Sequence, residues 1–379
     1  MTKKPDLRTS IEYCIMAHNK FRRIFFGWAA FPIWLALATY GLTEAFASHP
    51  GVTETVYSQT FYPIIAYVLS FLSKWVSFSV DDAFYGLLVL FGIILLILTI
   101  FRKLKVGRFI LLIFQTVAIC YVLFYWFWGF NYFRSGLNER LQIPKSRADT
   151  VKFAYVFKYL ITQTNESYCT YENTSHTAID SLVEASYKKN ASFLKLKYPQ
   201  GYRRPKSITL SAFFAKASIA GYYGPFFNEV HLNDSVLMVE YPQVLAHESA
   251  HQFGITSEAE ANFYSWLVCS QSESAYLRYS ADISMVSYFL SEAKRLHNFA
   301  DLVHQINKPV MDDIRKIQDH WDKMRSEGID KVAGKVNDAY LKTNKIEQGV
   351  KDYFGVVQFV MDFSSDSLAM KKVNSLNEK

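Results

Sequence analysis

The chain has 379 residues, of which half are apolar, 17% are aromatic and only 20% are charged. This composition excludes a disordered chain and a small disulfide-linked scaffold, and the length allows more than one domain. The net charge of +7 would indicate nucleic-acid binding only if the basic residues gathered on one folded face.

Most of the positive charge lies in two short segments near the start of the chain. Residues 1–23 carry a net charge of +4, and residues 102–108 carry another +4 without any acid. The stretch 44–82 has a net charge of −3, and everything from residue 134 onward has a net charge of +2. Because the long C-terminal part is almost balanced, we expect no nucleic-acid partner.

Three uncharged apolar runs separate these charged segments, at 24–43, 83–101 and 109–133. A helix needs about 20 apolar residues to cross roughly 30 Å of hydrocarbon, and each run is close to that length. A buried core helix is the alternative for such a run. We expect instead a membrane region over 24–133, with the third span at about 109–130 and its aromatic end at the bilayer surface.

The basic segments predict the orientation, because short loops rich in Lys and Arg stay in the cytoplasm. Residues 1–23 then form a cytoplasmic N-terminus, and residues 134–379 form an extracytoplasmic domain of a multi-pass cell-membrane protein. The start of the chain also resembles a signal peptide with a cleavage site near 45–47. That alternative leaves the large domain on the same side.

The segment 56–80 is apolar enough to suggest a fourth span. A fourth span would place the basic segment 102–108 outside the cell and Lys74 inside the bilayer, and both are unfavourable. We therefore expect 56–80 to be interfacial or re-entrant.

The outer domain is predicted to be mainly α-helical with a small β patch. Helical periodicity extends over six segments, which are 149–163, 176–195, 257–272, 274–298, 309–326 and 344–362. Between the second and third, Ser207–Phe214 and Phe227–Leu232 alternate in polarity, and a turn-rich stretch at 221–225 separates them. This pattern predicts a hairpin or a short meander.

The chemistry is concentrated in the motif HESAH, which begins at His247 and matches H-E-x-x-H. On a helix, His247 and His251 share one face and can bind one ion, and Glu248 can accept a proton from water. Pro242 suits the first turn of such a helix, and Gly254 suits its end. Two surface histidines beside a helical glutamate are the alternative.

A catalytic zinc needs three protein ligands and one open position. The segment after the motif offers Glu258 and Glu260 at the start of a second helix. Ser257 and Glu260 form a capping-box pattern, which gives Glu260 a structural role and leaves Glu258 as the better candidate ligand. Asn262 lies one turn beyond Glu258 and is predicted to orient a ligand histidine.

An HExxH helix followed by a helical E-x-x-x-D/N resembles the gluzincin zinc metallopeptidases. Nearly the whole chain also resembles a family of bacterial membrane proteins that have three N-terminal spans, an outer HExxH domain and no established activity. The resemblance is carried by YSQTFYP (57–63), FSVDD (78–82), WGFNYFR (128–134), GYYGPFFNEVHLN (221–233), HESAHQFGITSEAEANF (247–263) and NDAYLKTN (337–344).

This resemblance implies a zincin-like metallopeptidase domain after the transmembrane helices. His247, His251 and Glu258 would be the zinc ligands, and Glu248 would be the catalytic base. Gluzincins usually have Asp where this chain has Asn262. The Asn262 amide lacks the negative charge that an Asp carboxylate would have at this position.

We therefore expect a membrane-anchored zinc-dependent hydrolase that cleaves peptides or proteins outside the cytoplasm. The alternative is a non-catalytic membrane protein whose structural or vestigial zinc site serves envelope assembly or sensing. Glu248 favours the first, because a purely structural site needs no base.

Several points stay open from the sequence alone, among them the substrate and the oligomeric state. The third ligand is Glu258 or Glu260, and Cys169 and Cys269 would form a disulfide if they lay close together in an oxidising compartment. The β patch precedes the motif helix and is placed to bind an extended substrate. The candidates for oxyanion stabilisation are Tyr222, Tyr223, His231 and Tyr353.

Overall fold

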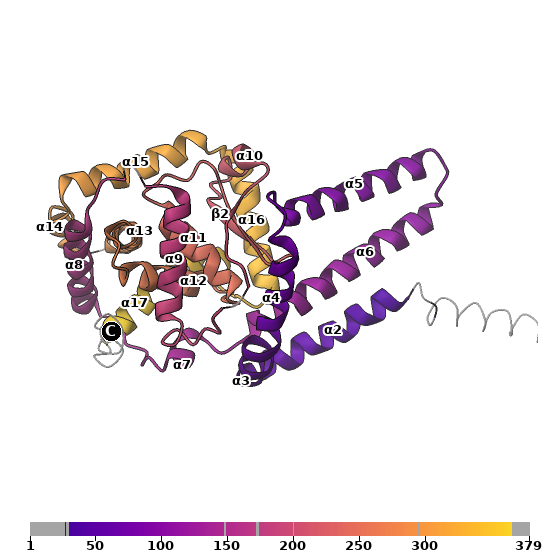
Figure 1. The fold of residues 1–379 in the computed structure, drawn as a ribbon, viewed down its shortest axis with the longest axis horizontal. Helices are drawn as coiled ribbons and strands as arrows, with labels where there is room; N and C mark the ends of the chain where they lie inside the picture. Colours follow the sequence, from indigo (N-terminus) through magenta and orange to yellow (C-terminus); the bar gives the residue numbers. More distant parts are fainter. Residues whose placement is uncertain are drawn as a thin grey trace, which may run out of the picture.

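The computed structural model describes residues 27, 30–147, 149–171, 174–199, 201–294 and 296–365. The predicted cytoplasmic N-terminus and the first residues of the predicted span 24–43 lie outside this part of the chain. The described residues form a mainly helical body with one three-stranded sheet, and three long helices project from that body (Figure 1).

The projecting helices are α2 (Phe31–Ser48), α5 (Val80–Ile100) and α6 (Val106–Phe127), and they run side by side away from the body (Figure 1). In the described part of the chain, α5 and α6 are long and apolar enough to cross a membrane. Only 6% and 11% of their apolar windows are buried. A core helix of a soluble protein would be buried, so these two helices have the character of membrane spans.

Three short helical segments connect α2 to α5 at the base of the projecting helices. They are α3 (Pro50–Val52), the π-helix η1 (Thr53–Phe61) and α4 (Tyr62–Ser73), and α4 lies across the inner ends of the projecting helices (Figure 1). One face of α4 is buried through Tyr62, Ala66, Ser70 and Ser73. Ile64, Val68 and Leu72 on the other face are exposed. Within the predicted interfacial segment 56–80, α4 is therefore an amphipathic helix at the junction.

The body contains most of the predicted helices. Its helical elements are η2 (Gly129–Phe133), α7 (Leu137–Leu141), α8 (Thr150–Ser167), α9 (His176–Asn190), α10 (Ser211–Ala215), α11 (Tyr241–Gln252), α12 (Glu258–Ser270), α13 (Ala275–Ala293), α14 (Phe299–Val303), α15 (Lys308–Met324), α16 (Glu327–Thr343), η3 (Gly349–Gly355) and α17 (Val356–Ser365). The predicted helix 344–362 is wrong in its first half, which follows the end of α16 and contains a turn and the 3₁₀-helix η3. α16 itself is absent from the prediction.

The sheet has the strand order β1-β3-β2, from β1 (Lys206–Ser207), β2 (Gly221–Gly224) and β3 (Glu229–Leu232). β2 and β3 are antiparallel, and β1 pairs with β3 in parallel. The small β patch is confirmed, but the predicted pairing is wrong, because the antiparallel partner of β3 is the stretch predicted as a turn and the segment that begins at Ser207 is its parallel neighbour. The predicted strand over 207–214 is wrong beyond Ser207, because most of its second half folds as α10. The stretch 221–225, predicted as a turn, contains the strand β2. The turn follows this strand and ends at Asn228, whose φ is +57°.

The core of the body is built around α11 and α12, which pack against each other and against α13. The small residues Ala246 and Ala250 on α11 are fully buried, and so is Ala261 on α12. Small side chains on facing helices allow the two backbones to approach closely. Cys169 and Cys269 are both free thiols, so they form no disulfide.

Candidate metal centre

The motif helix α11 begins and ends where its sequence indicates. Pro242 lies in its first turn, and Gly254 follows its C-terminus with φ +78°. A Cβ atom at Gly254 would lie 2.9 Å from both Asn131 Oδ1 and Tyr62 Cε1. Both the backbone conformation and the surrounding space therefore require glycine here. This turn brings α12 back against α11.

The two glutamates at the start of α12 have separate environments. The Ser257 side chain caps the helix by accepting a hydrogen bond from the Glu260 backbone N–H. Glu260 then points away from α11, where its carboxylate accepts hydrogen bonds from Arg140 Nη2 at 2.6 Å and from the Leu137 backbone N–H at 2.8 Å. Glu258 instead faces α11. Glu260 thus has a structural partner, although it is Arg140 rather than the helix cap itself.

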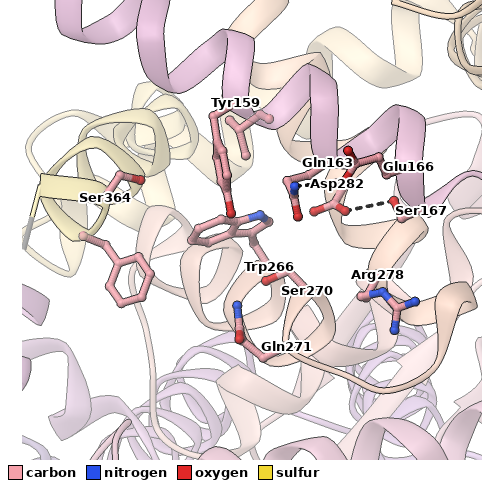
Figure 2. A pocket seen from close by; sticks show the side chains of 12 residues that line it. Tyr159, Gln163, Glu166, Ser167, Trp266, Ser270, Gln271, Arg278, Asp282 and Ser364 are labelled. Atoms are coloured by element: carbon pink, nitrogen blue, oxygen red, sulfur yellow. Dashed lines mark hydrogen bonds between the residues drawn. The ribbon is translucent and has the colours of Figure 1, made fainter. Parts of the chain in front are cut away.

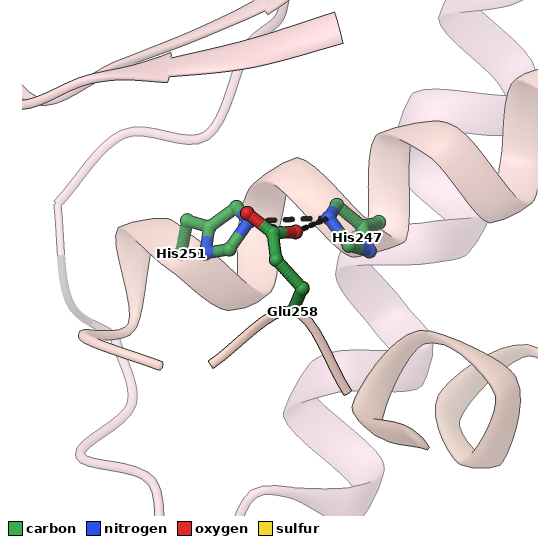
Figure 3. A group of neighbouring side chains, drawn as sticks. All are labelled: His247, His251 and Glu258. Carbon is green, nitrogen blue, oxygen red and sulfur yellow. Dashed lines mark hydrogen bonds and ion pairs between the residues drawn. The ribbon is translucent and has the colours of Figure 1, made fainter. Parts of the chain in front are cut away.

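Three ligand-type atoms converge between the two helices (Figure 3). The Nε2 atoms of His247 and His251 are 3.1 Å apart, and Glu258 Oε2 lies 3.1 Å from the first and 3.5 Å from the second. Their side chains are between 9% and 13% exposed, so the group is shielded but reachable from solvent.

Hydrogen bonds on the far side of each ring determine which nitrogen faces the centre. His247 Nδ1 lies 2.8 Å from Asn262 Oδ1, and His251 Nδ1 lies 2.7 Å from the Ile255 carbonyl. The Asn262 amide nitrogen donates to Tyr288 Oη, which leaves Oδ1 to face the imidazole. Both Nδ1 atoms therefore donate, and in neutral rings both Nε2 atoms carry a lone pair toward Glu258.

Three such acceptors at close range repel one another unless a cation or a proton lies between them. Burial alone would lower the pKa of His251, but the charge and hydrogen bond of Glu258 raise it to about 9. Burial likewise opposes ionisation of Glu258, yet the two imidazoles hold its pKa well below the ordinary value. Two imidazole nitrogens and one carboxylate oxygen form a donor set that suits zinc, so these residues fit the ion that the motif implies.

Glu248, the predicted base, is buried beside this group. Its side chain is 5% exposed, and its Oε2 atom has no hydrogen-bond partner among the described residues. Burial raises the pKa of Glu248, against the lowering effect of the two imidazoles. β2 packs directly against it, since a Cβ atom at Gly221 would lie 2.9 Å from the Glu248 side chain.

The four candidates for oxyanion stabilisation do not share one environment. Three of them form hydrogen bonds to other side chains, although His231 Nδ1 has no partner among the described residues. The partners are Asp82 for Tyr222, Asn228 for Tyr223 and Ser79 for His231. Burial, together with the nearby charge of Glu258, raises the pKa of Tyr353 well above its ordinary value. Tyr353 also forms a side-chain hydrogen bond, with Asn337, and the charge of His231 acts on Glu248, so both residues are linked electrostatically to the centre.

A second cluster, which sequence reasoning missed, lies where α5 meets the sheet. Asp81, Glu229 and His231 are all buried and lie close enough together to share an ion. Here Lys206 already pairs with Glu229, whose other oxygen accepts hydrogen bonds from the backbone N–H groups of Val80 at 2.8 Å and Asp81 at 3.1 Å. Lys206 supplies a positive charge to this cluster, and the hydrogen bonds of Glu229 join α5 to the sheet. No local pattern links residues so far apart in sequence.

β2 connects the two clusters. Its first residue, Gly221, contacts the side chain of Glu248, and its last residue, Gly224, contacts the side chain of Asp81. The backbone N–H groups of Phe226 and Phe227 in the following turn donate to Asp81 at 3.2 and 3.3 Å. A single four-residue strand therefore extends from the predicted base to the first turn of α5.

Comparison with known proteins gives one match. Residues 57–361 match the family described as "Protein of unknown function (DUF3810)", a range that includes α4, both clusters and most of α17. No curated protein and no solved structure matches the chain.

Proposed function

Because the chain belongs to the DUF3810 family, whose description assigns no activity, we propose its function from the centre itself: it is a zinc-dependent hydrolase anchored in a membrane. Its reaction is the cleavage of peptide bonds outside the cytoplasm. The observation that carries this proposal is the convergence of His247 Nε2, His251 Nε2 and Glu258 Oε2, with both Nδ1 atoms held by acceptors.

The order of the elements supports a gluzincin-like site. The HExxH motif lies on α11, the glutamate ligand begins α12, and Asn262 one turn later accepts a hydrogen bond from His247. Asn262 provides the oxygen acceptor of the usual Asp without its negative charge. It therefore orients the imidazole but adds no charge to the centre.

Each residue of the centre has a chemical task in this proposal. When bound, zinc would supply a Lewis acid for the scissile carbonyl and a lowered pKa for water. Glu248 takes the proton of the attacking water and delivers it to the nitrogen as the C–N bond breaks. Since β2 is at the edge of the sheet and Gly221 contacts Glu248, an extended peptide can pair with this strand and lie across the base.

The projecting helices support the membrane anchor. The basic segment 102–108 joins the apolar helices α5 and α6, and it would stay in the cytoplasm. That orientation puts the body, with its metal centre, on the opposite side of the bilayer. The exposed apolar face of α4 then lies at the membrane surface, where amphipathic helices are stable.

The test uses the full chain purified in detergent, with zinc content measured by mass spectrometry and cleavage measured on a mixed peptide library. We expect one zinc per chain in the wild type and in Glu248→Gln, and cleavage only in the wild type. Glu273→Gln is the matched control, because that side chain is 94% exposed and lies outside the centre.

The two possible failures have different meanings. A wild type without zinc would refute the metal centre. Zinc in every variant with no cleavage in any of them would refute the hydrolase and favour a non-catalytic zinc site in envelope assembly or sensing.

A further inference from the structure

A separate cavity lies in the body between α8, α12, α13 and α17 (Figure 2). Its volume is about 300 Å³, at the lower end of the roughly 300–1,000 Å³ of small-molecule sites. The residues that line it are different from those of the metal centre. The proposed hydrolase activity makes no use of it.

A buried carboxylate lies in this cavity. Asp282 is 5% exposed, and its Oδ2 atom accepts a hydrogen bond of 3.0 Å from Ser167 Oγ, which is a neutral donor. Burial raises the pKa of Asp282 to about 7. The Ser167 hydroxyl, the charge of Arg278 and the Trp266 side chain each act to lower this pKa, but they do not offset burial. A charge on Asp282 is therefore costly for the protein unless a further positive group approaches it.

An unpartnered donor lines the same cavity. Trp266 is 6% exposed, and its Nε1 atom forms no hydrogen bond in the part of the chain that the structure describes. Buried N–H groups almost always have an acceptor. The Trp266 side chain lies close enough to Asp282 to lower the pKa of that carboxylate, but its N–H forms no bond of normal geometry with it, so a ligand oxygen between the two can accept from Trp266. Trp266 and Tyr159 both line the cavity and offer aromatic surfaces to a cation (Figure 2).

The charges around the cavity favour a positive ligand. Glu166 also lines the cavity and adds a second carboxylate to that of Asp282. Arg278 is the one cationic side chain in the lining, and its Nη1 atom already donates to two backbone carbonyls, at 2.7 and 2.8 Å. The lining therefore has a net negative charge, which disfavours anions.

We propose that this cavity binds a small organic ammonium ion that carries a hydroxyl or carbonyl oxygen. The ammonium group pairs with the Asp282 carboxylate and lies against the aromatic rings. The oxygen accepts the hydrogen bond that Trp266 Nε1 has to donate. One ligand of this kind satisfies both buried groups at once.

The test is a titration of the full chain in detergent micelles, labelled with ¹⁵N in its tryptophans. Trp266→Phe assigns the indole signal of Trp266. The probe is ethanolamine, and ethylene glycol is the neutral counterpart of the same size. We expect a saturable shift of the Trp266 signal with ethanolamine and none with ethylene glycol.

Two further measurements separate binding at Asp282 from a general effect. Asp282→Asn should weaken ethanolamine binding at least tenfold, whereas Glu273→Gln, outside the cavity, should leave it unchanged.

Affinity should also fall about tenfold from pH 8 to pH 6, because a proton then competes for Asp282. The groups that face this carboxylate are Arg278 on its own helix, Glu166 and Tyr159 on α8, and Trp266 and Cys269 on α12; α17 brings Phe363 and Ser364, which carry no charge.

Three results would overturn the proposal. They are the absence of any saturable shift with ethanolamine, an equal response to ethylene glycol, and an unchanged affinity in Asp282→Asn. None of these outcomes depends on zinc or on hydrolysis.

Discussion

Glu258 and Glu260 are two residues apart on the same helix, and exchanging each for glutamine should have opposite consequences. Glu258→Gln removes the carboxylate that faces the two imidazoles. Glu260→Gln leaves that group intact and breaks a buried ion pair with Arg140. The two variants therefore separate metal binding from fold stability within a single turn.

The magnitudes follow from the contacts. The side chains of Arg140 and Glu260 are 2% and 10% exposed, with 2.6 Å between the charged atoms. Removing one partner of such a buried pair costs about 3–5 kcal/mol and should lower Tm by roughly 5 °C or more. Loss of an outer-shell partner alone weakens metal binding by about 10–100-fold, so loss of the Glu258 ligand should exceed about 100-fold.

The assay measures zinc per folded chain after dialysis against a weak chelator, together with Tm in excess chelator. Glu260→Gln should retain zinc and melt early, whereas Glu258→Gln should lose zinc. If Glu260→Gln lost zinc and Glu258→Gln retained it, our assignment of the third ligand would be wrong.

Three other substitutions test the surroundings of the centre. Gly254→Ala should destabilise the protein by about 1–3 kcal/mol, because its φ is +78° and no space exists for a methyl group, and a lowered Tm would show this. Gly221→Ala should displace the Glu248 side chain and abolish cleavage while zinc content stays at the wild-type level; full cleavage would show that β2 does not position the base. Glu54→Gln should cost about 3–5 kcal/mol by breaking the buried pair with Arg134. Burial opposes ionisation of Glu54, but Arg134 lowers its pKa below the ordinary 4.5, so its contribution to stability is present at neutral pH and is lost in acid. Tm measured from pH 7 to pH 3 should fall in the wild type by more than in Glu54→Gln.

The parts of the fold that the sequence predicts well are those with local signals. α11 and α12 begin and end near the predicted residues because Pro242, Gly254 and Ser257 act on their own backbone neighbourhood. The alternation over 207–214 is short and predicts the wrong structure, because hydrogen bonds from Asn233 and Asp234 to Ser211 support a turn of helix there instead. α16 was missed, and its buried contacts are few, with only Leu341 fully buried.

In the metal centre, too, the sequence predicts the features that depend on local structure and misses those that depend on distant residues. The spacing of His247 and His251 predicts that they share a face, and the capping pattern separates Glu258 from Glu260. Both inferences need only helical geometry. The salt bridge of Glu260 with Arg140 and the cluster of Glu229 with α5 join residues that are distant in sequence, and only the folded chain brings them together.

The contacts between the projecting helices and the body limit where the proposed activity can operate. A catalytic domain on a flexible stalk can be released by cutting the stalk, and it then acts at a distance. Here Tyr62 of α4 donates a hydrogen bond of 2.8 Å to the carbonyl of Gln252, at the end of α11, and the first turn of α5 donates to Glu229. A cut in α6 would separate the body from the segment that makes these contacts and would remove part of the support of the centre. Under the proposed function, the enzyme cannot be shed in active form, and its substrates must come to the surface of the membrane that holds it.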